Sequence, residues 1–504
     1  MKVKRGETIL PGLPCLIGGA LLTLAFAPFD YWVLAVAAIA LLFFCSLNCD
    51  PRQGFLRGYL FGLGMFGAGV NWLHISINQF GGMNLIGSLL VTLVLVLYLA
   101  LYPGLAILIG NRYFSSHGPI PQLCAFALLW VLCEWLRAWV FTGFPWLQVG
   151  YSMIDSPLTG LAPLAGTYGI GLAVTSSAAL LVAALMPATL WRRIGASILF
   201  GGLWFGAWTL KDIEWTTPAG GEISVALVQG GIPQDMKWQP QFQRQGFDLY
   251  LELTEPYWQH DLIIWPETAL PVLLSRAESY LDEIEQRRKE GRANLLLGMP
   301  VDDPATREFF NSALLLADEI AVYHKRHLVP FGEYLPMKSM LGGILDFLRI
   351  PMSDFSSGNP VSPVFANERF KAGISICYEA TFGREIIKAL PEAEFLINLS
   401  NDAWFGDSLA PHQHLQMARM RALETGRYLL RATNTGVTAI IDNEGRVLRQ
   451  AEQFVPAAIS GAVMPYAGMT PYALTGDLPA IGLCIAVLLA LYLARYFSPD
   501  DRAR

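Results

Sequence analysis

The feature that most constrains this chain is a set of long apolar runs confined to residues 1–210 and 478–497. A membrane-spanning helix needs about 20 apolar residues to cross a hydrocarbon core of roughly 30 Å. Eight runs meet this requirement, and each predicts one span: 9–27, 31–47, 58–77, 85–109, 123–141, 168–186, 194–210 and 478–497. The first run follows a basic start and also fits a signal peptide, but we expect it to remain as a span.

The stretch between the seventh and eighth runs is typical of water-soluble protein. Charged residues make up only 15% of the chain, against about 25% in a soluble domain, and the deficit lies in the apolar runs. We therefore expect a transmembrane domain at 1–211 with seven spans, a soluble domain at 212–477 that is large enough for a substantial hydrophobic core, and an eighth span with a tail at 478–504. The net charge of −6 excludes a basic nucleic-acid-binding protein.

Lysine and arginine residues in the short loops predict the orientation. The loops around Asp30, at 78–84 and at 142–167 contain no lysine or arginine. The opposite side is therefore predicted to be cytoplasmic and holds both termini, while domain 212–477 lies outside the cytoplasm. The basic residues on the cytoplasmic side are Lys2, Lys4, Arg5, Arg52, Arg57, Arg112, Arg192, Arg193, Arg495, Arg502 and Arg504.

Glu134 and Arg137 are the notable ionisable residues within the predicted spans, and their spacing places them on one helix face. Charged residues at membrane depth often mark function. We expect instead an ion pair near a helix end that neutralises itself. Charges do not recur along several spans, which argues against a transporter with an inert outer domain.

Cys377 is the only one of seven cysteines in domain 212–477. It cannot form a disulfide within that domain, and an unpaired thiol outside the cytoplasm is a liability. The thiol is therefore either a catalytic group or a buried, inert side chain.

Alternating β-rich and helical stretches predict an α/β fold for domain 212–477. Strands are expected at 223–228, 262–265, 293–298, 312–316, 320–323, 372–376, 395–399 and 437–441, and helices at 239–257, 275–292 and 412–427. Glu267, Lys325 and Cys377 each follow one of these strands. Loops at strand ends, held by a rigid sheet, are where catalytic residues usually lie. The sequence predicts no metal site, because His412 and His414 face different sides of their helix.

The order Glu267, Lys325, Cys377 resembles the nitrilase superfamily, whose triad is glutamate, lysine and cysteine on an αββα sandwich. In soluble members the cysteine is typically followed by tyrosine, aspartate and an Arg-Phe-Pro element. In this chain the sequence at 377–383 is instead Cys-Tyr-Glu-Ala-Thr-Phe-Gly. That motif, Leu-Val-Pro-Phe-Gly-Glu-Tyr at 328–334, Asn-Asp-Ala-Trp-Phe at 401–405 and the predicted topology resemble the apolipoprotein N-acyltransferase family over essentially the whole chain.

This resemblance implies an eight-helix transmembrane bundle with a periplasmic, nitrilase-like αββα domain in a bacterial inner membrane. It implies transfer of an acyl chain from a phospholipid, by family preference phosphatidylethanolamine, through a thioester to the N-terminal amine of diacylglyceryl-cysteine in a lipoprotein. It implies neither a metal nor an organic cofactor. The alternative is a membrane-anchored amidase that hydrolyses a carbon–nitrogen bond with the same triad.

The chemistry assigns a role to each member of the triad. A free thiol has a pKa near 8.5 and needs a base as it attacks a carbonyl. Glu267 is the candidate base. Lys325 and the backbone N–H after Cys377 are the candidate donors to the oxyanion.

Further site residues follow from the resemblance. Glu333, Tyr378 and Glu379 match positions that support the triad. Trp238 matches a tryptophan near the entrance of the site, and it equally fits an interfacial anchor. Stretch 335–351 is amphipathic and predicts either a helix packed on its own domain or a mobile arm beside the pocket; its candidate lid residues are Leu341, Ile344, Leu345 and Phe347.

Overall fold

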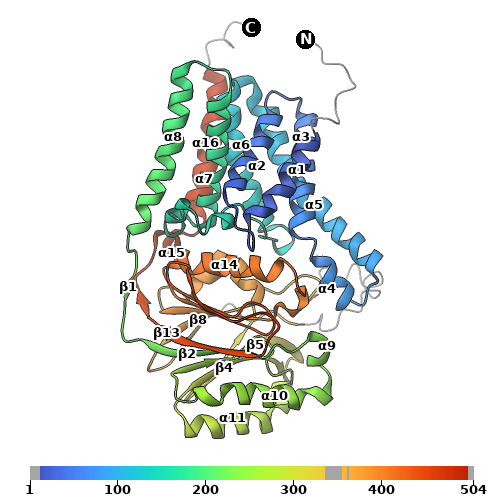
Figure 1. Cartoon of the computed structure of the whole chain (residues 1–504), viewed down its shortest axis with the longest axis vertical. Helices are drawn as coiled ribbons and strands as arrows, with labels where there is room; N and C mark the ends of the chain where they lie inside the picture. The colour runs from blue at the N-terminus through green and yellow to red at the C-terminus, as the bar shows by residue number, and fades with distance from the viewer. Residues whose placement is uncertain (1–11, 335–354, 360–362, 498–504) are drawn as a thin grey trace. The chain divides into compact units, whose positions relative to one another are not determined.

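The computed structural model describes residues 12–334, 355–359 and 363–497, and the chain forms two compact units (Figure 1). The helical unit comprises Met1–Trp72, Leu89–Ile213 and Leu474–Arg504. The sheet unit comprises Leu73–Ser88 and Glu214–Ala473. Segment Leu73–Ser88 thus belongs to the sheet unit, although the sequence placed it within the transmembrane domain.

A helix occupies each of the eight predicted runs: α1 (Gly12–Leu22), α2 (Val33–Ser46), α3 (Pro51–Gly69), α5 (Leu85–Phe114), α6 (Pro119–Arg137), α7 (Ala162–Leu185), α8 (Leu190–Thr209) and α16 (Leu478–Phe497). Within the described residues, three helical stretches are long and apolar enough to cross a membrane: Leu85–His117, Pro119–Arg137 and Pro157–Leu185. Helix α3 and α4 (Leu73–Gln79), bent by 53°, raise this number to four if they form one span. The count of eight spans therefore stays a prediction.

Helices α1 and α3 approach one another closely because a glycine on each helix faces the backbone of the other. A Cβ atom on Gly19 would lie 1.9 Å from the carbonyl oxygen of Phe61, and one on Gly64 would lie 2.0 Å from that of Leu16. Small residues allow such backbone contact between membrane helices. Any larger side chain at either glycine would push the two helices apart.

Glu134 and Arg137 bind the loop after α6 and not each other. Arg137 Nη1 donates to the carbonyl oxygens of Phe144 (2.5 Å) and Trp146 (2.6 Å), and the Val149 N–H donates to Glu134 Oε1 (3.0 Å). The ion pair predicted between these two described residues is not formed. Backbone groups of the following loop bind both buried side chains instead.

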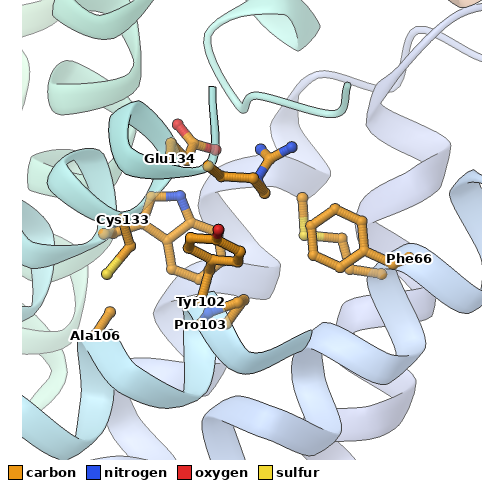
Figure 2. A pocket seen from close by; sticks show the side chains of 9 residues that line it. Phe66, Tyr102, Pro103, Ala106, Cys133 and Glu134 are labelled. Carbon is orange, nitrogen blue, oxygen red and sulfur yellow. The ribbon is translucent and has the colours of Figure 1, made fainter. Parts of the chain in front are cut away.

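Glu134 also lines a small cavity among α3, α5 and α6 of the helical unit (Figure 2). Aromatic and aliphatic side chains form most of its wall, and the rings of Phe66 and Tyr102 flank it. The lining residues are Met65, Phe66, Tyr102, Pro103, Ala106, Trp130, Cys133, Glu134 and Arg137. None of the three predicted triad residues belongs to this cavity.

In the part of the sheet unit that the structure describes, most strands belong to two six-stranded sheets. The first has the order β13 (Ala457–Val463), β2 (Ile223–Gln229), β3 (Leu262–Ile264), β4 (Asn294–Asp303), β5 (Glu308–Leu316), β6 (Ile320–His324). The second has the order β12 (Val447–Gln450), β11 (Ala439–Ile441), β10 (Leu429–Thr433), β9 (Phe395–Ser400), β8 (Lys371–Ile376), β7 (Val364–Ala366). Strands β2 to β4 are parallel in the first sheet, as are β8 to β10 in the second.

Alternating side chains in the strands build the layers of this unit. Val225 and Leu227 of β2 lie in the core between the two sheets, whereas Ala226 and Val228 pack in a separate core with helices α10 (Pro240–Thr254) and α11 (Glu278–Glu290). In Figure 1, α10 and α11 run along one side of the strands and α14 (Ala410–Thr425) along the other. The two-residue period of a strand thus produces an αββα sandwich. The predicted α/β fold is confirmed.

Helix α4 packs against the turn Asp402–Phe405 within the sheet unit. Ser76 Oγ donates to the carbonyl oxygen of Trp404 at 2.5 Å, and the ring of Phe80 meets the Trp404 indole edge-on at 5.1 Å. Chain that lies between two apolar helices in the sequence is therefore part of the sandwich domain.

Candidate active site

Glu267, Lys325 and Cys377 follow β3, β6 and β8, and all three are buried, with 6%, 1% and 9% of their surface exposed. Lys325 Nζ lies 3.6 Å from Glu267 Oε1. The charges of both residues act on the Cys377 thiol. The structure therefore brings the three predicted residues together, from strands of both sheets.

Lys325 is held as a cation by two carboxylates. Its Nζ donates to Glu333 Oε1 at 2.9 Å, and the Val329 N–H donates to Glu333 Oε2 at 2.8 Å. Burial alone would lower the pKa of Lys325, but the charges of Glu333 and Glu267 outweigh it and hold that pKa above its ordinary value. The ammonium group is therefore a permanent positive charge at this site.

Asn311, which the sequence analysis missed, connects the two carboxylates. From strand β5 its side-chain Nδ2 donates to Glu267 Oε1 at 2.7 Å and to Glu333 Oε1 at 2.8 Å, and its backbone carbonyl oxygen accepts the backbone N–H of Lys325 at 2.8 Å. The only sequence signal is a polar residue inside a largely apolar strand. Asn311 fixes the relative positions of all three charged groups.

Cys377 adopts the left-handed conformation with φ of 51°, which is costly for a residue that carries a Cβ atom. It opens a turn that continues to Thr381. Burial raises the pKa of the Cys377 thiol, the carboxylate of Glu267 raises it further, and the ammonium of Lys325 lowers it. The net shift is upward, so the thiol is protonated at neutral pH and needs a base in order to react.

Glu379 links the loop after β6 to the turn that begins at Cys377. Its carboxylate accepts the hydroxyl of Tyr323 (2.9 Å) and the N–H groups of Arg326 (2.7 Å), His327 (3.2 Å) and Ile376 (2.7 Å). Burial raises the pKa of Glu379, and these N–H donors lower it again in part. Glu379 thus holds the Lys325 loop and the Cys377 turn in register.

Tyr378 packs its ring edge-on against His327, at 5.8 Å between ring centroids, and against Phe382, at 5.1 Å. The contact joins the same two loops that Glu379 connects. Both predicted supporting residues after Cys377 therefore lie at the site.

Trp238 follows the short helix α9 (Gln234–Lys237) and is half-buried. Its neighbour Lys237 is almost fully buried and donates from Nζ to the carbonyl oxygen of Glu267 at 3.1 Å. Burial lowers the pKa of Lys237 to about 7. The segment that contains Trp238 is thereby attached to the loop that carries Glu267.

The predicted lid residues Leu341, Ile344, Leu345 and Phe347 lie outside the described residues. Among the residues that the structure does describe, no cluster of three or more His, Cys, Asp or Glu side chains is arranged to hold a metal ion.

Comparison with known proteins places these features in a family. The family model for the apolipoprotein N-acyltransferase N-terminal domain matches residues 18–180, and the family model for carbon-nitrogen hydrolase matches residues 224–466. Apolipoprotein N-acyltransferase of Methylococcus capsulatus is 44% identical over 480 residues, which cover 94% of both chains. The chain belongs to the apolipoprotein N-acyltransferase family.

Other apolipoprotein N-acyltransferases are similarly related. The Nitrosomonas europaea protein is 42% identical over 94% of this chain and 95% of its own, and the Pseudomonas aeruginosa protein 39% identical over 98% of both. A crystal structure of Saccharomyces cerevisiae Nit3, a member of the nitrilase superfamily, aligns with a TM-score of 0.39 and 16% identity, covering 50% of this chain and 93% of that one.

Membership of the apolipoprotein N-acyltransferase family makes this chain an enzyme of lipoprotein N-acylation. Its acceptor is a lipoprotein, and its apolar helices fit an inner-membrane enzyme that works in a lipid environment. The near full-length match does not favour the amidase alternative.

Proposed function

We propose that this enzyme acylates Cys377 from a phospholipid and transfers the acyl chain from that thioester to the N-terminal amine of diacylglyceryl-cysteine in a lipoprotein. One observation carries the proposal: a buried thiol, carboxylate and ammonium from three separate strand ends converge, with 3.6 Å between Lys325 Nζ and Glu267 Oε1. Phosphatidylethanolamine is the proposed donor.

In the first half-reaction, Cys377 Sγ attacks the ester carbonyl of the phospholipid as Glu267 takes the thiol proton. The raised pKa of Cys377 is why this step needs a base. Negative charge then develops on the carbonyl oxygen. Lys325 Nζ and the Tyr378 N–H are the proposed donors to it, and loss of one such donor typically lowers the rate about 100- to 1,000-fold.

The tetrahedral intermediate collapses when its bond to the lipid alkoxide breaks. Glu267 returns the proton to that oxygen, so that a lysophospholipid leaves and the acyl chain stays on sulfur. In the second half-reaction the acceptor amine attacks the thioester, Glu267 takes a proton from the nitrogen, and Cys377 leaves as the thiolate and regains a proton. The products are an amide and the free enzyme, a ping-pong sequence.

Three further residues are proposed to keep the triad in place. Glu333 holds Lys325, while Glu379 and Tyr378 join the loops that carry Lys325 and Cys377. The proposal includes the topology expected from the loop charges: eight spans, both termini in the cytoplasm, and a periplasmic domain at 212–477.

The test is the mass of the Cys377 peptide after the purified full chain is incubated with phosphatidylethanolamine vesicles, with and without a diacylated lipopeptide. We expect an acyl adduct that disappears when the lipopeptide is added, with the acyl group recovered as an amide. Cys377→Ala should carry no adduct. An unmodified Cys377 in an active enzyme would refute the proposal, and loss of the adduct in buffer alone would indicate hydrolysis.

A further inference from the structure

Two buried side chains contact the backbone carbonyl of Cys377. His414 Nε2, on α14, lies 3.2 Å from this oxygen, and Asn398 Nδ2, on β9, lies 3.4 Å from it. Both side chains are essentially inaccessible to solvent. The left-handed conformation of Cys377 is therefore supported from inside the domain by groups that are not part of the triad.

The other ring nitrogen of His414 contacts an ion pair. Nδ1 lies 3.0 Å from Asp402 Oδ1 and 3.0 Å from Arg431 Nη2, and Arg431 Nη2 donates to Asp402 Oδ2 at 2.7 Å. Arg431 Nη1 also donates to Asn398 Oδ1 at 2.5 Å. Asp402 and Arg431 thus orient both of the side chains that touch the Cys377 carbonyl.

The hydrogen-bonding roles of His414 follow from its partners. A carbonyl oxygen can only accept, so Nε2 must carry a hydrogen and donate to Cys377. Arg431 Nη2 can then donate to the lone pair on Nδ1, which leaves a neutral imidazole with its hydrogen on Nε2. In this form Nδ1 has no hydrogen for Asp402 Oδ1, so Asp402 acts on the ring through Arg431, which it binds. Burial and the charge of Arg431 lower the pKa of His414, in agreement with this neutral form.

Because the peptide bond is planar, this contact also sets the orientation of the neighbouring N–H group. The carbonyl of Cys377 and the N–H of Tyr378 belong to one rigid unit and point in opposite directions. A carbonyl fixed against His414 therefore directs the Tyr378 N–H to the opposite side, where the mechanism uses it as an oxyanion donor. The same constraint limits the rotation that would carry Cys377 Sγ away from Glu267.

We propose that His414 is a positioning residue for acyl transfer, which holds the Cys377–Tyr378 peptide in its reactive orientation while Arg431, bound by Asp402, holds the imidazole. This inference rests on the proposed function of Cys377 as the nucleophile. It assigns a role to His414 that does not require contact with either substrate.

Two substitutions of the same residue separate positioning from general stability. In His414→Gln the side-chain amide nitrogen can reach the place of Nε2 and still donate to Cys377. In His414→Asn the amide reaches only the place of Nδ1, where its oxygen can still accept from Arg431 Nη2, and the donor to Cys377 is lost. We expect His414→Asn to slow formation of the Cys377 thioester roughly tenfold, which corresponds to about 1.4 kcal/mol and lies within the range for loss of one buried hydrogen bond.

The measurements are the single-turnover rate of acyl-adduct formation on the Cys377 peptide, the KM for phosphatidylethanolamine in vesicles, and the rate of Cys377 alkylation by iodoacetamide. Expected are slower acylation and altered alkylation in His414→Asn, an unchanged KM, and at least partial rescue in His414→Gln. Equal acylation rates per folded molecule in both variants and wild type would overturn the inference. If wild type itself forms no adduct, the proposed function fails instead, so the two failures are distinguishable.

Discussion

Replacement of Asn311 by leucine tests whether the carboxylate of Glu267 is the base. The Asn311 amide donates to Glu267 Oε1 and to Glu333 Oε1, and leucine of similar volume removes both hydrogen bonds. A hydrogen bond to a charged group contributes about 1.5–3 kcal/mol, and each 1.4 kcal/mol lost from a transition state lowers the rate about tenfold. Loss of the hydrogen bond to Glu267 should therefore leave its carboxylate less firmly placed beside the thiol and slow thioester formation roughly 10- to 100-fold.

Only the carboxylate of Glu267 can accept the thiol proton, so a displaced carboxylate should slow the chemical step and leave donor binding unchanged. The assay is the single-turnover rate of thioester formation, with the KM for phosphatidylethanolamine measured alongside. Asn294→Leu is a matched control, because Asn294 is also a buried asparagine of the first sheet but donates to the Asp261 carbonyl (3.0 Å). A folded Asn311→Leu enzyme that forms the thioester at the wild-type rate would refute the reasoning.

Three further predictions concern groups around the triad. Gly436→Ala would place a Cβ 2.3 Å from Asp402 Oδ2; we expect a loss of about 1–3 kcal/mol in unfolding free energy and slower thioester formation, whereas Gly221→Ala, with nothing within 4 Å, should match wild type in both. Burial lowers the pKa of Lys237 from 10.5 to about 7, so the unfolded chain binds more protons between these values and wild type should gain stability over Lys237→Met as pH rises from 7 to 9; an unchanged difference in Tm contradicts this. Glu379→Gln keeps one acceptor oxygen in place of two and should lower the unfolding free energy by about 1–3 kcal/mol. Thermal unfolding measures this loss, and a Tm equal to that of wild type would contradict the prediction.

The sequence predicted the elements whose signal is local. Glu267, Lys325 and Cys377 each follow a short apolar run that ends at a recognisable break, and such a run predicts a buried strand without knowledge of its neighbours. The resemblance then supplied the order of the triad and the supporting residues Glu333 and Glu379. These residues lie close together in the structure because sheet topology brings the ends of β3, β6 and β8 to one place.

Features that depend on distant partners were missed. Strand β10 contains Arg431, a charge that argues against a buried strand until Asp402 is known to neutralise it. Asn311 carries little signal alone, because its importance comes from carboxylates 44 and 22 residues away. The ion pair expected between Glu134 and Arg137 failed for a related reason: helical spacing brought them to one face, but backbone groups of the next loop bind both.

The segment Leu73–Ser88 has a consequence for how this enzyme can be divided. A fragment of residues 214–473 would contain every triad residue, yet it would lack Ser76 and Phe80, which bond to and cover Trp404. The Trp404 indole, which packs against Phe80 in the intact protein, would then be exposed to water at a position two residues after Asp402 in the sequence. The domain is therefore discontinuous in the gene, and a soluble enzyme excised from it has to restore that helix as an added peptide or a grafted loop.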